Sequence, residues 1–112
     1  MTGPVLIERR GAVTVLTLHR PERRNAVDHA TLLALAAAID EVRGDGTRAV
    51  VLTGEPPAFC AGADLTGVEE GEFAAALARV LIGFTDLPIP VIAAIDGPAL
   101  GAGTQLASVC DL

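Results

Sequence analysis

Two stretches of this sequence each combine an apolar, strand-like run, a loop of small residues and an amphipathic helix, in that order. The first covers residues 48–84 and the second covers residues 91–110. Where strands and helices alternate along a chain, the strands pair in parallel and the helices pack on the sheet. The order therefore predicts an α/β fold in which both loops emerge at equivalent strand ends and could converge on one ligand.

The remaining segments fit the same fold. Two runs rich in Val, Leu, Ile and Thr indicate a hairpin that turns at Arg10-Gly11. Both faces of its second strand are largely apolar, so we expect that strand to be covered on both sides. Asp28 is placed to cap the first helix. The predicted elements are strands 5–10 and 13–19, helix 29–43, strand 48–53, helix 70–84, strand 91–95 and a short helix from about residue 101.

Composition indicates a single globular domain without an internal boundary. Apolar residues make up 51% of the 112 residues, and the net charge is −6 with no lysine. This acidic balance argues against nucleic-acid binding. We find no membrane-spanning run and no leader-like segment in residues 1–10, so we expect a cytoplasmic protein that does not bind membranes. Its two cysteines, Cys60 and Cys110, are then expected to be reduced thiols.

Several familiar catalytic motifs are incomplete. Gly101-Ala-Gly103 begins a dinucleotide-binding fingerprint but lacks the third glycine, and a phosphate loop would require lysine. Ser108 lacks the flanking glycines of a nucleophile elbow. His19 and His29 are not at a metal-ligand spacing from the cysteines, so we expect no metal site. Cys60 fits a buried structural residue better than a nucleophile.

A pair of backbone donors, one from each small-residue loop, is the chemistry that the sequence supports. Residues 101–103 carry almost no side chain, and the first N–H groups of a helix have no intrahelical partners. Two preorganised N–H groups aimed at a carbonyl that becomes an enolate would each contribute roughly 3–4 kcal/mol. Turn formation and close packing explain an isolated Gly-Ala-Gly equally well, and only the two loops together favour an oxyanion site.

Three segments together resemble the crotonase superfamily, the enoyl-CoA hydratase/isomerase proteins. They are residues 20–27 (RPERRNAV), 58–65 (AFCAGADL) and 90–103 (PVIAAIDGPALGAG). The resemblance implies a spiral of ββα units that binds an acyl-CoA thioester, of which residues 1–112 would form the N-terminal part. Full members of the family are more than twice this length. We therefore expect a fragment, and a homotrimer or hexamer for the full-length protein.

The resemblance also implies a set of site residues. The amides of Ala63 and Ala102 would bind the thioester carbonyl, and Ala102 suits its position if its backbone is helical. Arg24 would lie near the CoA phosphates, and the family's frequent lysine contact is replaced by Thr66. The implied CoA-binding residues are Arg24, Ala61, Ala63, Asp64, Leu65 and Gly101. Among these, the backbone of Ala61 and Ala63 would lie near the adenine, and Asp64 would serve as a structural hydrogen-bonding group. No cofactor is implied beyond the coenzyme A of the substrate.

Gln105 separates the possible functions. In hydratases of this family a glutamate at this place is one of two carboxylates that activate water, and an amide cannot take up a proton. The second carboxylate would lie beyond residue 112. The sequence leaves open an enoyl-CoA hydratase or isomerase of fatty-acid metabolism, a non-catalytic acyl-CoA carrier and a purely structural domain. With a single acid/base, isomerisation is favoured over hydration, and Gln105 can also be read as a polar helix residue without a role.

Overall fold

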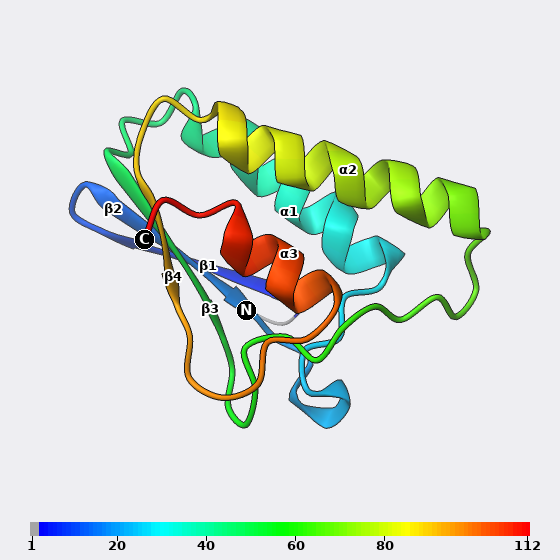
Figure 1. Cartoon of the computed structure of the whole chain (residues 1–112). Coiled ribbons are helices and arrows are strands. Elements are labelled where there is room, and N and C mark those ends of the chain that lie inside the picture. The colour runs from blue at the N-terminus through cyan, green and yellow to red at the C-terminus, as the bar shows by residue number, and fades with distance from the viewer. Residues whose placement is uncertain (1–2) are drawn as a thin grey trace.

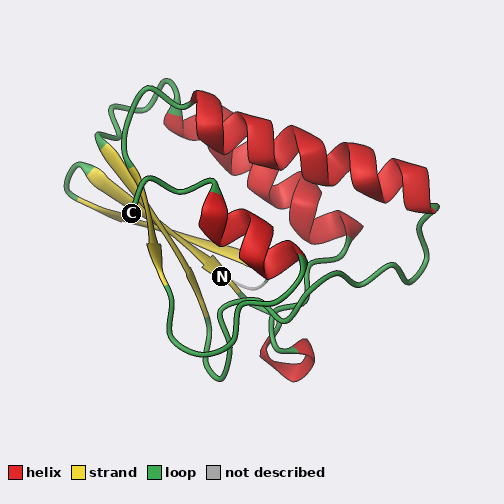
Figure 2. Cartoon of the chain, viewed as in Figure 1, coloured by secondary structure: helices red, strands yellow, loops and turns green. Residues whose placement is uncertain are grey.

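Three helices cover one face of a four-stranded sheet in the computed structural model, which describes residues 3–112 (Figure 1). Figure 2 shows the helices gathered on one side of the strands. The elements are β1 (Val5–Arg10), β2 (Val13–Leu18), the 3-10 turn η1 (Pro21–Arg23), α1 (His29–Val42), β3 (Ala49–Gly54), α2 (Glu70–Asp86), β4 (Val91–Ala94) and α3 (Ala102–Ser108). Apart from η1, every element was predicted, and the boundaries agree within two residues.

The sheet has the predicted pairing. β1 and β2 form an antiparallel hairpin, and β2, β3 and β4 are parallel in the order β1-β2-β3-β4. The α/β prediction is therefore confirmed. α2 continues two residues past its predicted end and stops where Leu87 leaves the helical conformation, with a ψ of 131°. Leu87 precedes Pro88, and a residue before proline disfavours the α region.

The core lies between the sheet and the two longer helices. Asp28 caps α1 by accepting a hydrogen bond from the Thr31 amide at 2.8 Å. The apolar stripe of this helix is buried throughout and consists of Leu32, Leu35, Ala36, Ile39 and Val42. The stripe of α2 is buried at three positions and half-buried at Leu77 and Leu81. Fully buried side chains at the centre of the core include Leu16, Leu32, Leu35, Leu52, Phe59, Val80 and Leu106.

The opposite face of the sheet is only half-buried. In β2, Thr14 and Leu16 are buried beneath the helices, whereas Val13 and Val15 on the other face are of intermediate exposure. The prediction that this strand is covered on both sides is wrong for the part of the chain that the structure describes. Strands added in one direction with right-handed crossovers place successive helices on the same face.

A pattern of strand, extended segment and helix occurs three times in the structure, although the sequence analysis found only two of these units. Each of β2, β3 and β4 is followed by a short extended segment and then by a helix. The extended segments pair with one another through two parallel bridges, Val27↔Ala63 and Cys60↔Ala99. The polar composition of residues 19–28 concealed the first of these segments. The result is a strand, bridge and helix unit that repeats, as expected for ββα units.

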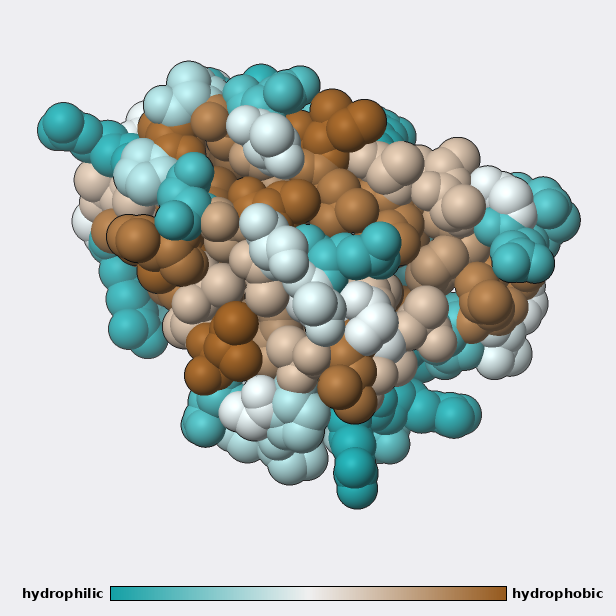
Figure 3. Space-filling model, viewed as in Figure 1, coloured by the Kyte–Doolittle hydropathy of each residue, from teal (hydrophilic) through white to brown (hydrophobic). Residues whose placement is uncertain are grey.

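Apolar side chains also reach the surface over α2 and beside α3 (Figure 3). Ile82 of α2 is 60% exposed, while Leu77, Leu81 and Val109 are partly buried against the core. Within residues 3–112, no helix combines the length and the apolar character that crossing a membrane requires.

Candidate functional site

The two small-residue loops lie side by side, as predicted. The Leu100 amide donates a hydrogen bond to the Cys60 carbonyl at 3.0 Å, next to the bridge between Cys60 and Ala99. Gly62 and Gly101 are so close that a methyl group on Gly101 would lie 3.7 Å from the Cα atom of Gly62. In Figure 1 both loops run below the N-terminus of α3. The fold therefore brings residues 61–64 and 99–102 to one place.

Glycines fix the start of α3 on the first loop. Gly101 has a φ of 52° and a ψ of −118°, a conformation that side chains disfavour. A Cβ atom on Gly103 would lie only 2.2 Å from the Cys60 carbonyl oxygen, so the helix touches the loop backbone there. Ala102 begins the helix, and the only non-glycine residues in 3–112 with positive φ are Arg24 and Asn25. An alanine therefore fits at 102 without strain.

The amides of Ala63 and Ala102 have no hydrogen-bond acceptor in the part of the chain that the structure describes. The Val27 amide donates to the Gly62 carbonyl at 2.9 Å, and the Asp64 amide donates to the Val27 carbonyl at 2.8 Å. Successive groups of an extended segment alternate in direction, so the Ala63 N–H faces away from Val27. Within residues 3–112, no protein oxygen accepts a hydrogen bond from either amide. Two unpaired donors thus lie in adjoining loops.

A buried asparagine holds the segment that pairs with the first loop. Asn25 is 1% exposed and has a left-handed φ of 61°. Its Oδ1 accepts a hydrogen bond from the Arg20 amide at 2.8 Å, and its Nδ2 donates to the carbonyls of Glu55 (2.7 Å) and Ala58 (2.8 Å). Sequence reasoning missed both Arg20 and Asn25, because a polar loop gives no sign that one of its side chains is buried.

Asp64 is fully ionised at neutral pH, and both oxygens of its carboxylate accept hydrogen bonds. Hydrogen bonds from Thr66, followed by the Arg20 guanidinium, lower the pKa of Asp64 to about 2. The Thr66 amide donates to Oδ1 at 3.0 Å, and Arg20 Nη2 donates to Oδ2 at 3.1 Å. A carboxylate held in this way accepts hydrogen bonds and does not exchange a proton near neutral pH. This geometry supports the structural role expected for Asp64.

The other predicted site residues lie around these loops. Arg24 is exposed, and its carbonyl accepts a hydrogen bond from the Ala61 amide at 3.0 Å. Because this bond uses the Ala61 N–H, only the Ala61 carbonyl remains to bind a ligand. Leu65 is 46% exposed. Gln105 is exposed on α3 three residues after Ala102, a spacing that places the two residues on one side of the helix.

Both cysteines are free thiols with little tendency to ionise. Burial raises the pKa of the Cys60 thiol, which donates a weak hydrogen bond to the Gly62 carbonyl at 3.5 Å. Burial and the neighbouring Asp111 raise the pKa of Cys110 to about 11. The thiolate is the nucleophile, so Cys60 has the character of a structural residue. Among the described residues, no three His, Cys, Asp or Glu side chains are grouped to hold a metal ion.

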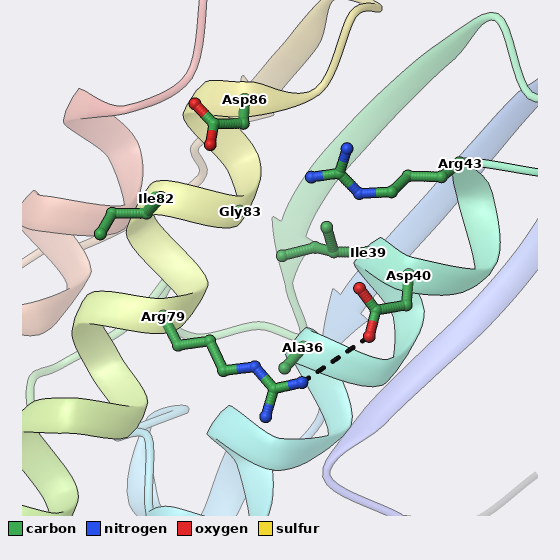
Figure 4. Close-up of a pocket in the computed structure, with 8 residues that line it drawn as sticks. All are labelled: Ala36, Ile39, Asp40, Arg43, Arg79, Ile82, Gly83 and Asp86. Carbon is green, nitrogen blue, oxygen red and sulfur yellow. Dashed lines mark ion pairs between the residues drawn. The ribbon is translucent and has the colours of Figure 1, made fainter.

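A cavity of about 330 Å³ lies away from these loops, between α1 and α2 (Figure 4). Ile39 and Gly83 contribute to its apolar part, and Arg79 pairs with Asp40 across it at 3.7 Å. Its lining residues all belong to α1, its C-cap Arg43, and α2. None of the predicted site residues lines this cavity, so it is a separate feature.

Comparison with known proteins identifies the family. The family model described as enoyl-CoA hydratase/isomerase matches residues 8–112. A probable enoyl-CoA hydratase of Mycobacterium tuberculosis is 44% identical over 107 residues, which cover 95% of this chain and 44% of that protein. The mitochondrial methylglutaconyl-CoA hydratase of Mus musculus is 40% identical over 113 residues, which cover 94% of this chain and 36% of that protein.

Solved structures agree with these relatives. An enoyl-CoA hydratase of Mycobacterium smegmatis superimposes with a TM-score of 0.93 at 38% identity, covering 99% of this chain and 47% of that one. An enoyl-CoA hydratase/carnithine racemase of Magnetospirillum magneticum gives a TM-score of 0.91 at 33% identity, and the match covers 100% of this chain and 46% of that one. The chain thus spans less than half the length of these proteins. It belongs to the enoyl-CoA hydratase/isomerase family and has the crotonase fold over that part.

Proposed function

We propose that this chain supplies the thioester-binding loops of an enoyl-CoA hydratase or isomerase that acts in fatty-acid metabolism. The observation that carries the proposal is the pair of unpaired amides, Ala63 N–H and Ala102 N–H, in two adjoining loops. Both would donate hydrogen bonds to the thioester carbonyl oxygen. This oxygen gains negative charge as the substrate approaches an enolate, so donors fixed in advance stabilise the transition state more than the substrate.

The remaining site residues would bind the CoA portion. Arg24 is exposed beside the first loop, where its guanidinium could pair with a phosphate. The free carbonyl of Ala61 could accept a hydrogen bond from the adenine amino group, since its amide is already bound. Gly101 and Leu65 would contact the ligand through backbone and apolar surface. No cofactor is needed, because coenzyme A is part of the substrate.

Gln105 determines which reaction these loops serve. Its amide can orient a water or a substrate oxygen by hydrogen bonding but cannot accept a proton from water. Proton transfer would then depend on a single acid/base outside residues 1–112, which suits double-bond isomerisation better than hydration. The exposed, proton-inert Gln105 also favours a second candidate, a non-catalytic acyl-CoA carrier.

Substitution of Gln105 by glutamate separates these candidates. Hydration of a short 2-enoyl-CoA and binding of a saturated acyl-CoA are measured in the wild type and in Gln105→Glu. Rapid hydration by the wild type would refute the carrier. Binding without turnover, with hydration appearing only in Gln105→Glu, would refute a wild-type hydratase. Ser108→Glu adds the same charge one turn further along α3 and serves as the control.

The oxyanion site itself is tested by Ala102→Pro. Proline at the first position of a helix removes an N–H that has no intrahelical partner, and its fixed φ suits that position. Turnover, or carbonyl polarisation in a bound thioester, is expected to fall by roughly 10²–10³-fold, as for the loss of one oxyanion donor. Unchanged turnover in a folded Ala102→Pro variant would exclude this amide from the site.

A further inference from the structure

One guanidinium group connects three segments around the candidate site. Arg20 Nη1 donates a hydrogen bond to the Ala26 carbonyl at 2.6 Å. Arg20 Nη2 donates to the Asp64 carboxylate at 3.1 Å and lies 3.7 Å from the Asp28 carboxylate. The Arg20 side chain is only 17% exposed, so water competes weakly for these contacts. Shielded contacts of one guanidinium with several acceptors hold geometry better than an exposed ion pair does.

Apart from backbone hydrogen bonds, the first loop has few contacts that hold its shape. Residues 61–63 are Ala-Gly-Ala, and their side chains offer no polar group. Backbone hydrogen bonds of Ala61 to Arg24, and of Gly62 and Asp64 to Val27, attach the loop to the segment at residues 24–27. Asp64 is therefore the only residue of this loop whose side chain ties it to a different segment.

The segment at residues 24–27, which pairs with the loop, is also held by Arg20. Arg24 and Asn25 both have left-handed backbone angles, with φ of 51° and 61°, which non-glycine residues rarely adopt. Arg20 bonds to this segment three times. Its amide donates to the Asn25 side chain, its carbonyl accepts from the Asn25 amide at 2.9 Å, and its Nη1 donates to the Ala26 carbonyl. A single residue thus braces both sides of the pairing that orients the Ala63 amide.

Loss of the Arg20 side chain would displace the loop at residues 61–64 and leave Asp28 in place. Asp28 is fixed at the start of α1, because its carboxylate accepts hydrogen bonds from the Thr31 amide and hydroxyl. Without the guanidinium, the Asp28 and Asp64 carboxylates would face each other without a cation and repel. Because Asp28 is anchored to the helix, the displacement would fall on Asp64 and the loop before it.

We infer that Arg20 is a positioning residue, which holds the loop at residues 61–64 so that the Ala63 amide stays directed at the thioester oxygen. The inference rests on the proposed function, since it assigns a purpose to that amide. Arg20 itself would not touch the reacting atoms. Its removal should therefore reduce polarisation of the thioester carbonyl more than it reduces binding of the CoA portion.

The first test uses a conjugated 2,4-dienoyl-CoA, whose absorption moves to longer wavelength when its carbonyl is polarised. The wild type and Arg23→Gln should show the same shift on binding, because Arg23 is exposed in the same segment. Arg20→Gln should lose most of the shift, while its Kd rises less than tenfold. Arg20→Lys should recover part of the shift, since an ammonium retains the charge but not the planar fork. A full shift in Arg20→Gln would overturn the inference.

The second test needs no ligand and separates this inference from the proposed function. In Arg20→Gln, amide exchange at Asp64 should accelerate tenfold or more, and the pKa of Asp64, followed by NMR, should rise from about 2. Neither should change in Arg23→Gln. If the wild type fails to bind the dienoyl-CoA, the proposed function fails, and exchange still decides whether Arg20 holds the loop. Unchanged exchange in Arg20→Gln would overturn the inference; if that variant does not fold, Arg20→Lys replaces it.

Discussion

The loops that follow β3 and β4 have equivalent places in the repeat but differ in the contacts that hold them. Polar side chains from the preceding turn of the chain, Arg20 and Asn25, hold the loop after β3. Among the described residues, the loop after β4 has no side-chain cap at the start of α3. It is held by backbone hydrogen bonds of Pro98 and Leu100 to residues 59–60 and by the close contact between Gly103 and the Cys60 carbonyl. Two amides with the same proposed task are thus positioned with the help of polar side chains in one loop, and by backbone hydrogen bonds and close packing in the other.

This difference determines how each loop should respond to a perturbation. The first loop should respond to removal of a polar group and to acid, because ionic contacts and hydrogen bonds to Asp64 and Asn25 hold it. The second loop should respond to added volume, because no space remains beside Gly103.

Gly103→Ala should have the largest effect on stability. The added Cβ would lie 2.2 Å from the Cys60 carbonyl oxygen and 2.8 Å from the Cys60 Cβ, so α3 must move away from the loop. We expect a loss of about 3 kcal/mol, at the upper end for overpacking in a well-packed region. Urea unfolding followed by circular dichroism measures it.

Gly44→Ala provides the control for Gly103→Ala. Within residues 3–112, no heavy atom lies within 4 Å of a Cβ added at Gly44, and the φ of Gly44 is not left-handed. Its free energy of unfolding should therefore stay within about 0.5 kcal/mol of the wild type. Equal unfolding midpoints for the two alanine variants would show that close packing does not hold the second loop.

Asn25→Ala should come next, and it disturbs the first loop. The substitution leaves the Glu55 and Ala58 carbonyls and the Arg20 amide without their partner, and it places alanine at a left-handed φ of 61°. We expect a loss of about 2 kcal/mol from the unpaired buried groups. Asn25→Gly removes the same hydrogen bonds but tolerates the backbone angle, so it should be less destabilised. If both variants unfold like the wild type, the asparagine does not support the loop.

Acid should weaken the first loop before the second. The pKa of Asp64 is about 2 in the folded chain, below its ordinary value of 3.8, so the folded state favours the carboxylate. This contribution is complete above about pH 4 and is lost as the pH falls through about 2. Asp64→Asn should flatten the pH dependence of unfolding in that window. Equal curves for Asp64→Asn and the wild type would contradict the pairing with Arg20 and Thr66.

Periodicity and loop composition were sufficient to predict most of the fold from the sequence. Alternating strands and helices gave the parallel sheet, and the small residues of two loops indicated where they meet. The condition for an alanine at 102, a helical backbone, is met in the structure, where the positive φ lies at its neighbour Gly101. These features follow from local preferences of the chain.

The bracing of the first loop was not predictable in the same way. Arg20 and Asp64 are far apart in the sequence, and a charge in a loop rich in arginine resembles a solvated side chain. The burial of Asn25 depends on carbonyls that β3 delivers, so it becomes visible only once the sheet is formed. The half-buried outer face of β2 was mistaken for a covered one, because apolar content alone does not say which face the helices take.

Gln105→Ala should have the smallest effect on stability. Gln105 is exposed, and its side chain takes part in none of the hydrogen bonds found within residues 3–112. We expect a change within about 0.5 kcal/mol, as for other surface positions. The unfolding midpoint in urea measures it beside Gly103→Ala, two residues earlier on the same helix. An unchanged free energy of unfolding would show that α3 does not need the Gln105 side chain, which could then contact a ligand. A decrease of more than about 1 kcal/mol would show instead that this side chain stabilises the fold.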